Sequence, residues 1–162
     1  MRIRLFALAL AALASLTIFG SHGAQAQGTP LFAVLNGVNE CNGAAVPNPL
    51  TCRVGDTDGY GSATILFTAA TQLCFGITVD NIGNVTAAHI HTGSPGVNGP
   101  IIVNLSPPAG VGNPRAWAGC VAVAAATANA IKANPTAFYV NVHTTGAPAP
   151  AFPNGAIRGQ LF

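Results

Sequence analysis

Apolar and polar residues alternate with a period of two along much of the chain. The segments 61–69 (GSATILFTA) and 72–80 (QLCFGITVD) show this most regularly. Because successive side chains of a strand point to opposite faces, the pattern predicts two half-buried antiparallel strands. Segments of similar composition predict six more strands, at 31–35, 85–91, 100–105, 115–123, 137–143 and 156–162.

Turn residues separate these segments and define the fold class. Gly, Pro and Asn interrupt the alternation at every junction. One helix is predicted over residues 124–134, ending before Pro135. Many short strands with turn signals between them indicate an all-β sandwich or a small barrel. We favour an antiparallel β-sandwich of the immunoglobulin-like or superoxide-dismutase-like Greek-key type, with one short helix.

The N-terminus has the composition of a secretory signal peptide. Arg2 and Arg4 precede an apolar run, 5–19, which is too short for a stable membrane span and is followed by the small-residue motif AQA. We therefore predict a signal peptide over residues 1–26 and a single mature domain over residues 27–162. The domain would be secreted or periplasmic, with no membrane span after cleavage.

Charge is scarce and evenly balanced in the mature domain. The chain has six basic residues, and cleavage would remove Arg2 and Arg4, leaving four basic against four acidic residues. Nucleic-acid and anionic-membrane binding both need clustered Lys and Arg, and the remaining basic residues are scattered. We therefore expect no nucleic-acid partner, and instead an unknown extracellular protein or surface ligand.

Four cysteines lie in the mature domain, and an even number behind a secretory signal favours two disulfides. Three pairings are possible. We favour Cys41–Cys52, which closes a local loop rich in Pro and Asn, and Cys74–Cys120, which joins strands distant in sequence. The chain has no C-x-x-C spacing that would indicate a cysteine metal site.

Two histidines, His89 and His91, are one residue apart on a predicted strand. Both rings should lie on the same face of the strand as Val85, whereas Ile90 should point to the opposite face. The segments HIHTGSPGVNGPII and NVHTTGAPAPAFPNGAIR share the order strand, His, Thr, Pro-rich loop, Asn-Gly and strand, which matches His91 with His143. Two such hairpins lying side by side would bring the three histidines together.

These segments carry a family likeness. Together with LFAVLNGVNE and DGYGSATILF, they resemble the signature segments of the CHRD domain, a module named after chordin and also found singly in secreted bacterial proteins. The resemblance covers nearly all of residues 30–162 and implies an all-β, extracytoplasmic domain. One departure is that the family often has Glu before the final Ile-Arg-Gly-Gln, where this chain has Ala156.

The histidines allow two interpretations. As metal ligands, His89, His91 and His143 would suit copper, which we prefer, or zinc. As a buried polar network they would need hydrogen-bond partners, which Asn141 and Arg158 could supply. The H-x-H pattern is similar to the copper-binding strand of copper,zinc superoxide dismutases. However, the rest of that site has no counterpart here, so dismutase chemistry is not expected.

Three further features have simpler structural interpretations. Arg158 could hold a ligand carboxylate, but an anchor that bonds loop carbonyls is the commoner role of such an arginine. The motif DTDGYG, residues 56–61, has too few carboxylates for an EF-hand loop and is interpreted as a turn. Trp117 is expected in the core, against a disulfide at Cys120.

The sequence contains no catalytic constellation beyond the histidines. It has no G-x-S-x-G nucleophile motif, no phosphate-binding glycine loop and no suitably placed pair of carboxylates. We therefore predict a non-catalytic CHRD-domain binding or adhesion module, with the loops that follow His91 and His143 as its contact surface. The alternative function is a copper- or zinc-binding protein that uses the histidine cluster.

Overall fold

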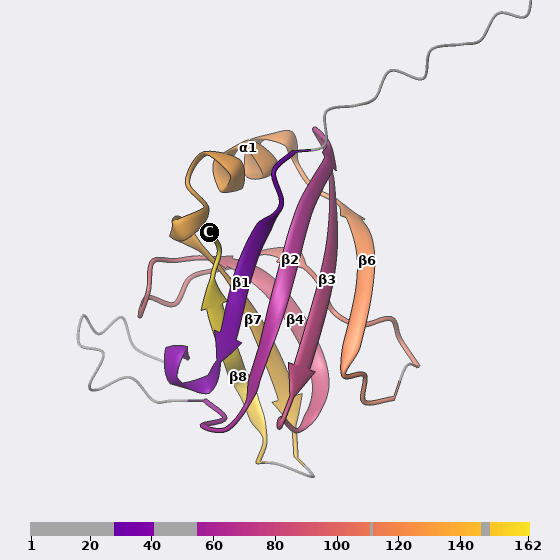
Figure 1. Ribbon diagram of the computed structural model, residues 1–162, viewed down its shortest axis with the longest axis vertical. Coiled ribbons are helices and arrows are strands. Elements are labelled where there is room, and N and C mark those ends of the chain that lie inside the picture. Colours follow the sequence, from indigo (N-terminus) through magenta and orange to yellow (C-terminus); the bar gives the residue numbers. More distant parts are fainter. Residues whose placement is uncertain (1–27, 41–54, 111, 147–149) are drawn as a thin grey trace, which may run out of the picture.

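The computed structural model describes residues 28–40, 55–110, 112–146 and 150–162 (Figure 1). The predicted signal peptide and the proposed Cys41–Cys52 disulfide lie outside these residues. Within them, no helix is long and apolar enough to cross a membrane. The elements are β1 (Leu31–Asn36), η1 (Gly37–Asn39), β2 (Tyr60–Ala69), β3 (Gln72–Asp80), β4 (Asn84–Thr92), β5 (Ile101–Asn104), β6 (Ala116–Ala122), α1 (Ala125–Ala133), η2 (Pro135–Ala137), β7 (Phe138–Thr145) and β8 (Phe152–Gln160).

The strands form a single eight-stranded sheet in the order β5-β4-β7-β8-β1-β2-β3-β6. Every pairing is antiparallel. The sheet curls so that β1, β2, β3 and β6 form one wall, which faces β4, β7 and β8 (Figure 1). The indole N–H of Trp117 on β6 donates to the Leu105 carbonyl just after β5, at 2.7 Å, and so bridges the two end strands.

This architecture confirms the antiparallel all-β prediction with one short helix and corrects its detail. The sandwich expectation requires two separate sheets, whereas β8 and β1 pair here and join the two walls into one barrel-like sheet. Alternation along a strand fixes which face is apolar, but it does not fix whether neighbouring strands belong to one sheet or two.

The core lies between the two walls. Ile65, Leu73 and Ile77 from β2 and β3 are at most 1% exposed, as are Ile90 of β4 and Val140 of β7. The helix α1 lies across one end of the barrel (Figure 1) and buries Ala128 and Ile131. Burying a large aliphatic side chain contributes about 1.5–3 kcal/mol, so this interior provides the main driving force for folding.

The disulfide Cys74–Cys120 is confirmed, and it joins directly opposed residues of β3 and β6. Trp117 is buried in the core as predicted, but it does not share a face with this disulfide. It lies three positions before Cys120 on the same strand, so the two side chains leave opposite faces of the sheet. The exposed position of Cys120 agrees with that placement.

The segment DTDGYG forms the predicted turn. The Gly59 N–H donates to the Asp56 carbonyl at 3.1 Å, and β2 begins at Tyr60.

Candidate metal centre

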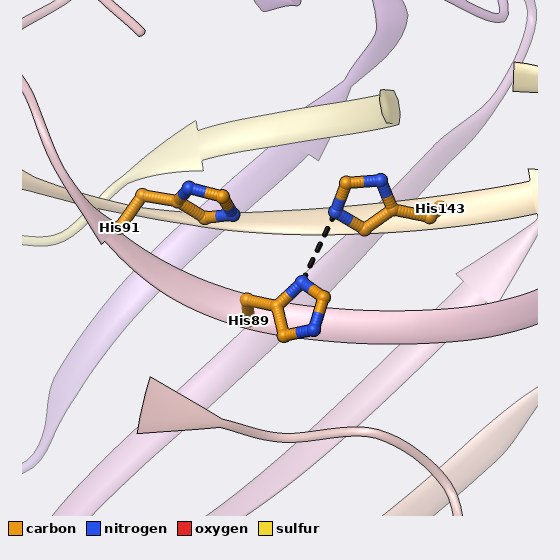
Figure 2. Close-up of side chains that lie close together, drawn as sticks. All are labelled: His89, His91 and His143. Carbon is orange, nitrogen blue, oxygen red and sulfur yellow. Dashed lines mark hydrogen bonds between the residues drawn. The ribbon is translucent and has the colours of Figure 1, made fainter. Parts of the chain in front are cut away.

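Strands β4 and β7 are neighbours in the sheet, so the two His-containing hairpins lie side by side. Their register places His89 opposite Asn141 and Ala87 opposite His143. The face of β4 that carries His89 and His91 therefore continues onto β7 at His143. Figure 2 shows the three rings directed toward a common point.

One part of the predicted β4 face is wrong. Val85 was expected beside the histidines, but it is buried in the core with Ile90. The pairing of β4 with β7 shifts register between Val85 and Ala87, so an extra residue reverses the direction of the side chains before it. A bulge of this kind leaves no signal in a simple alternation pattern.

The three histidines can each direct one ring nitrogen to the same place. One such nitrogen from each residue lies within 4.8 Å of the other two. His89 Nδ1 and His143 Nε2 are 3.1 Å apart, which is a hydrogen bond between the rings (Figure 2). The ring centroids of His91 lie 5.6 Å from His89 and 6.1 Å from His143.

Backbone carbonyls fix the tautomers of two of these rings. His91 Nδ1 bonds the Gly99 carbonyl at 2.9 Å, and His143 Nδ1 bonds the Pro153 carbonyl at 3.0 Å. A carbonyl oxygen only accepts, so each Nδ1 carries the proton and each Nε2 keeps its lone pair. Gly99 follows Asn98 in the loop after β4, and Pro153 precedes Asn154-Gly155 near the start of β8, so each histidine bonds the backbone next to the Asn-Gly pair that follows it.

The Nε2 atom of His91 is the unusual atom of the cluster. It is buried and has no hydrogen-bond partner. A buried nitrogen lone pair without a partner is costly and calls for an explanation. Because this atom carries no proton and faces the other two rings, it is available to a Lewis acid.

The surroundings keep the three imidazoles neutral. Burial lowers the pKa of His89 to about 4, with smaller contributions from the neighbouring rings of His143 and His91. Burial also lowers the pKa of His91 and of His143, against the opposing effect of their hydrogen bonds to backbone carbonyls. Neutral imidazole is the form that binds a metal ion, so at neutral pH no ring has to lose a net charge before it can bind one.

Arg158 lies beside the cluster and serves as an anchor for the loop between β4 and β5. It is 1% exposed, and its guanidinium lies 3.3 Å from the ring centre of Tyr139, which stacks on His91. It donates to the carbonyls of Ser94 and Val97 at 3.0 and 2.9 Å. The side chains of Asn98 and Gln160 also accept from it.

Asn141 lies on the same face but its side chain bonds elsewhere. It was expected to accompany His143, and instead its amide donates to Glu40 Oε1 at 3.2 Å. Sequence reasoning did not find Glu40 or Tyr139. Glu40 follows η1 and is 101 positions from Asn141, so no local pattern connects the two residues.

Comparison with known proteins gives one match. The model of a family described as the CHRD domain matches residues 31–161, nearly the whole described chain. No curated protein and no solved structure matches the chain.

Proposed function

This chain belongs to the CHRD domain family, and we propose that it is an extracytoplasmic, non-catalytic binding protein. Its ligand in this proposal is a copper or zinc ion held by His89, His91 and His143. The observation that carries the proposal is the buried His91 Nε2, which has a lone pair, no partner and two further imidazoles beside it.

The chemistry of the donors supports these metals. Three neutral imidazole nitrogens suit copper and zinc, whereas calcium and magnesium require oxygen ligands. Histidine ligands of metals usually donate their second ring N–H to a carbonyl or carboxylate, which fixes the ring. His91 and His143 already make that bond to Gly99 and Pro153.

The hydrogen bond between His89 and His143 competes with metal binding, because it uses the same ring nitrogens. Without a metal ion, His89 Nδ1 donates to the unprotonated His143 Nε2 at 3.1 Å. Binding a metal through this nitrogen of His89 moves its proton to the other ring nitrogen. The side chain of His89 is partly exposed, so water can exchange that proton.

The disulfide supports the extracytoplasmic part of the proposal. Cys74–Cys120 is a structural crosslink, and such bonds persist in oxidising compartments. The non-catalytic part rests on the sequence, which has no nucleophile or carboxylate constellation beyond the three histidines.

A second candidate function is metal-independent recognition by the loop between β4 and β5, residues 93–100. Arg158 and Gln160 hold the backbone of this loop through the carbonyls of Gly93, Ser94 and Val97. A loop fixed on a rigid sheet is suited to contact an extracellular protein or surface ligand. In that case the histidines would only stabilise the base of the loop.

Titration of the full chain with Cu²⁺ and with Zn²⁺ distinguishes these functions. We expect one bound ion per chain, and His91→Ala should weaken binding by at least about 10–100-fold, as for other perturbed metal sites. Gln72→Ala is the control, because it changes an exposed polar side chain on β3, outside the proposed site, and should leave binding unchanged. Absence of stoichiometric uptake, or equal uptake by His91→Ala, would contradict the metal proposal.

The pH dependence of that titration provides a second test. Acid protonates the imidazoles and expels the ion. Since burial lowers the pKa of all three histidines, with His89 near 4, the ion should be retained at pH 6. A site built from ordinary exposed histidines, with a pKa near 6.5, would already be losing it.

A further inference from the structure

A second polar group lies near the histidines and is not explained by metal binding. Glu40 follows β1 and η1 and is 1% exposed, and Asn141 on β7 is 2% exposed. The amide N–H of Asn141 donates to Glu40 Oε1 at 3.2 Å. A carboxyl group buried this deeply normally has partners for both of its oxygens.

Each member of this pair has one side-chain oxygen without a partner. Glu40 Oε2 and Asn141 Oδ1 are both buried and make no hydrogen bond. Both atoms are acceptors as long as Glu40 is ionised, so neither can satisfy the other. A single proton on Oε2 would remove both deficits, because a carboxylic acid and a primary amide have complementary donor and acceptor edges.

We propose that Glu40 holds a proton in the folded protein and forms a two-hydrogen-bond ring with Asn141, which links the end of η1 to β7 in a pH-dependent manner. In this ring Oε2–H donates to Asn141 Oδ1, and Asn141 Nδ2–H donates to Oε1. The inference goes beyond the proposed metal function and does not depend on it.

The backbone around Glu40 excludes water from the carboxyl group. A Cβ on Gly155 of β8 would lie 2.4 Å from Glu40 Cδ and 2.6 Å from each carboxyl oxygen. A Cβ on Gly55 would lie 3.1 Å from Glu40 Cβ. Glycine at both positions therefore lets two backbone segments close over the side chain.

The charged neighbours of Glu40 do not provide an ion pair that would keep it ionised. Arg158 of β8 favours the ionised form at a distance, but its guanidinium donates to the 93–100 loop, Asn98 and Gln160. Tyr139 of β7 faces the carboxyl as a neutral phenol. Asp56, next to Gly55, interacts with Asp58 instead. Burial outweighs these effects and raises the pKa of Glu40 to about 7.

The sign of the pH dependence follows from that shift. The folded state binds the Glu40 proton more tightly than the unfolded state, in which the pKa is near its ordinary value of 4.5. The stabilisation is therefore complete below about pH 4.5 and is lost as pH rises toward 7. Above pH 7 the ring opens, because the ionised carboxylate has no proton to donate.

Glu40→Gln tests this directly, since glutamine presents the same donor and acceptor edges as a protonated glutamate at every pH. Urea unfolding of wild type and variant, with a metal chelator present, should give similar stabilities near pH 4. By pH 8 the wild-type unfolding constant should have risen relative to that of the variant by on the order of 100-fold. The histidines titrate in both proteins, so their contribution cancels in the comparison.

Asp80→Asn is the matched control. Asp80 is an exposed carboxylate whose pKa is lowered by hydrogen bonds from the Asn81 backbone and Tyr60, so its substitution should not reproduce the Glu40 trend. As a second readout, the carboxyl carbon of Glu40 should titrate in NMR near pH 7, with no such signal in Glu40→Gln. A Glu40 titration near pH 4, or a variant whose deficit grows with pH, would overturn the proposal. Neither result would affect the metal titration.

Discussion

The two walls of the barrel use their outer faces differently. On the wall of β1, β2, β3 and β6, the outward residues of β2 and β3 are exposed or half-buried and form simple surface pairs, such as Ser62 with Thr78 at 2.9 Å. On β7 and β8, Tyr139, Asn141 and Arg158 also point away from the core, yet each is at most 2% exposed. The first wall therefore has a single buried face, whereas β7 and β8 of the second wall are buried on both faces around these residues.

This difference explains where the unusual chemistry is found. A polar side chain on an exposed face can use water, whereas one on a doubly buried face needs a protein partner or a ligand. The unpartnered side-chain atoms of His91, Glu40 and Asn141 all belong to the second wall or to the segment packed on it. If the walls differ in this way, substitutions on the second wall should have effects that comparable substitutions on the first wall lack.

The largest effect is expected from the disulfide of the first wall. Replacing both Cys74 and Cys120 by Ala should lower the free energy of unfolding by about 4 kcal/mol, because the crosslink closes a long loop in the unfolded chain. Urea unfolding measures the loss. Metal uptake by the variant should be unchanged at a temperature where it is folded. A simultaneous loss of uptake would show that the two walls are not independent.

Arg158 should give the next largest effect. Arg158→Met keeps much of the apolar stem but removes the bonds to Ser94 and Val97, and we expect a loss of about 3 kcal/mol. Arg115→Met on the exposed side is the control and should cost less than about 1 kcal/mol, since Arg115 makes one bond to a backbone carbonyl. Equal losses in thermal or urea unfolding would contradict the proposed difference between the walls.

Two glycines, one from each wall, allow the same substitution to be compared on both walls. Gly155 on β8 has φ +135° and lies against the Glu40 carboxyl, so Gly155→Ala should destabilise the fold by about 2 kcal/mol. Gly76 on β3 has no atom within 4 Å of an added Cβ, so Gly76→Ala should be neutral or slightly stabilising. A tolerated Gly155→Ala would show that Glu40 is not tightly enclosed.

The smallest effect belongs to the surface pair of the first wall. Ser62→Ala removes a hydrogen bond to Thr78 that water can replace, so stability should change by less than about 0.5 kcal/mol. A larger loss in urea unfolding would mean that this outer face is also a protected environment.

Much of this architecture could be predicted from the sequence, because period-two alternation and turn residues are local signals. The strand at 72–80 was predicted with the bounds that the structure shows, and the predicted helix at 124–134 is α1, Ala125–Ala133. The proximity of His91 and His143 followed from two hairpins of the same design. The interpretation of these residues as ligands remains a proposal.

The remaining features depend on contacts that no local pattern encodes. The pairing of β1 with β8 joins the two walls into one sheet. It brings together Asn36 and Arg158, which are about 120 positions apart in the chain. The bulge that turns Val85 into the core reverses an otherwise regular alternation. Glu40 and Asn141 meet only after the chain has closed, so their complementary edges are visible only in the structure.

X-ray absorption spectroscopy of the zinc-loaded protein tests the central claim most directly. We predict a first shell dominated by imidazole nitrogen at about 2.0–2.1 Å, with three histidines contributing. His143→Ala should reduce that histidine contribution, and Gln72→Ala on β3 should leave the spectrum unchanged. A shell composed of oxygen, or a spectrum insensitive to His143→Ala, would contradict the assignment of His89, His91 and His143 as the metal site.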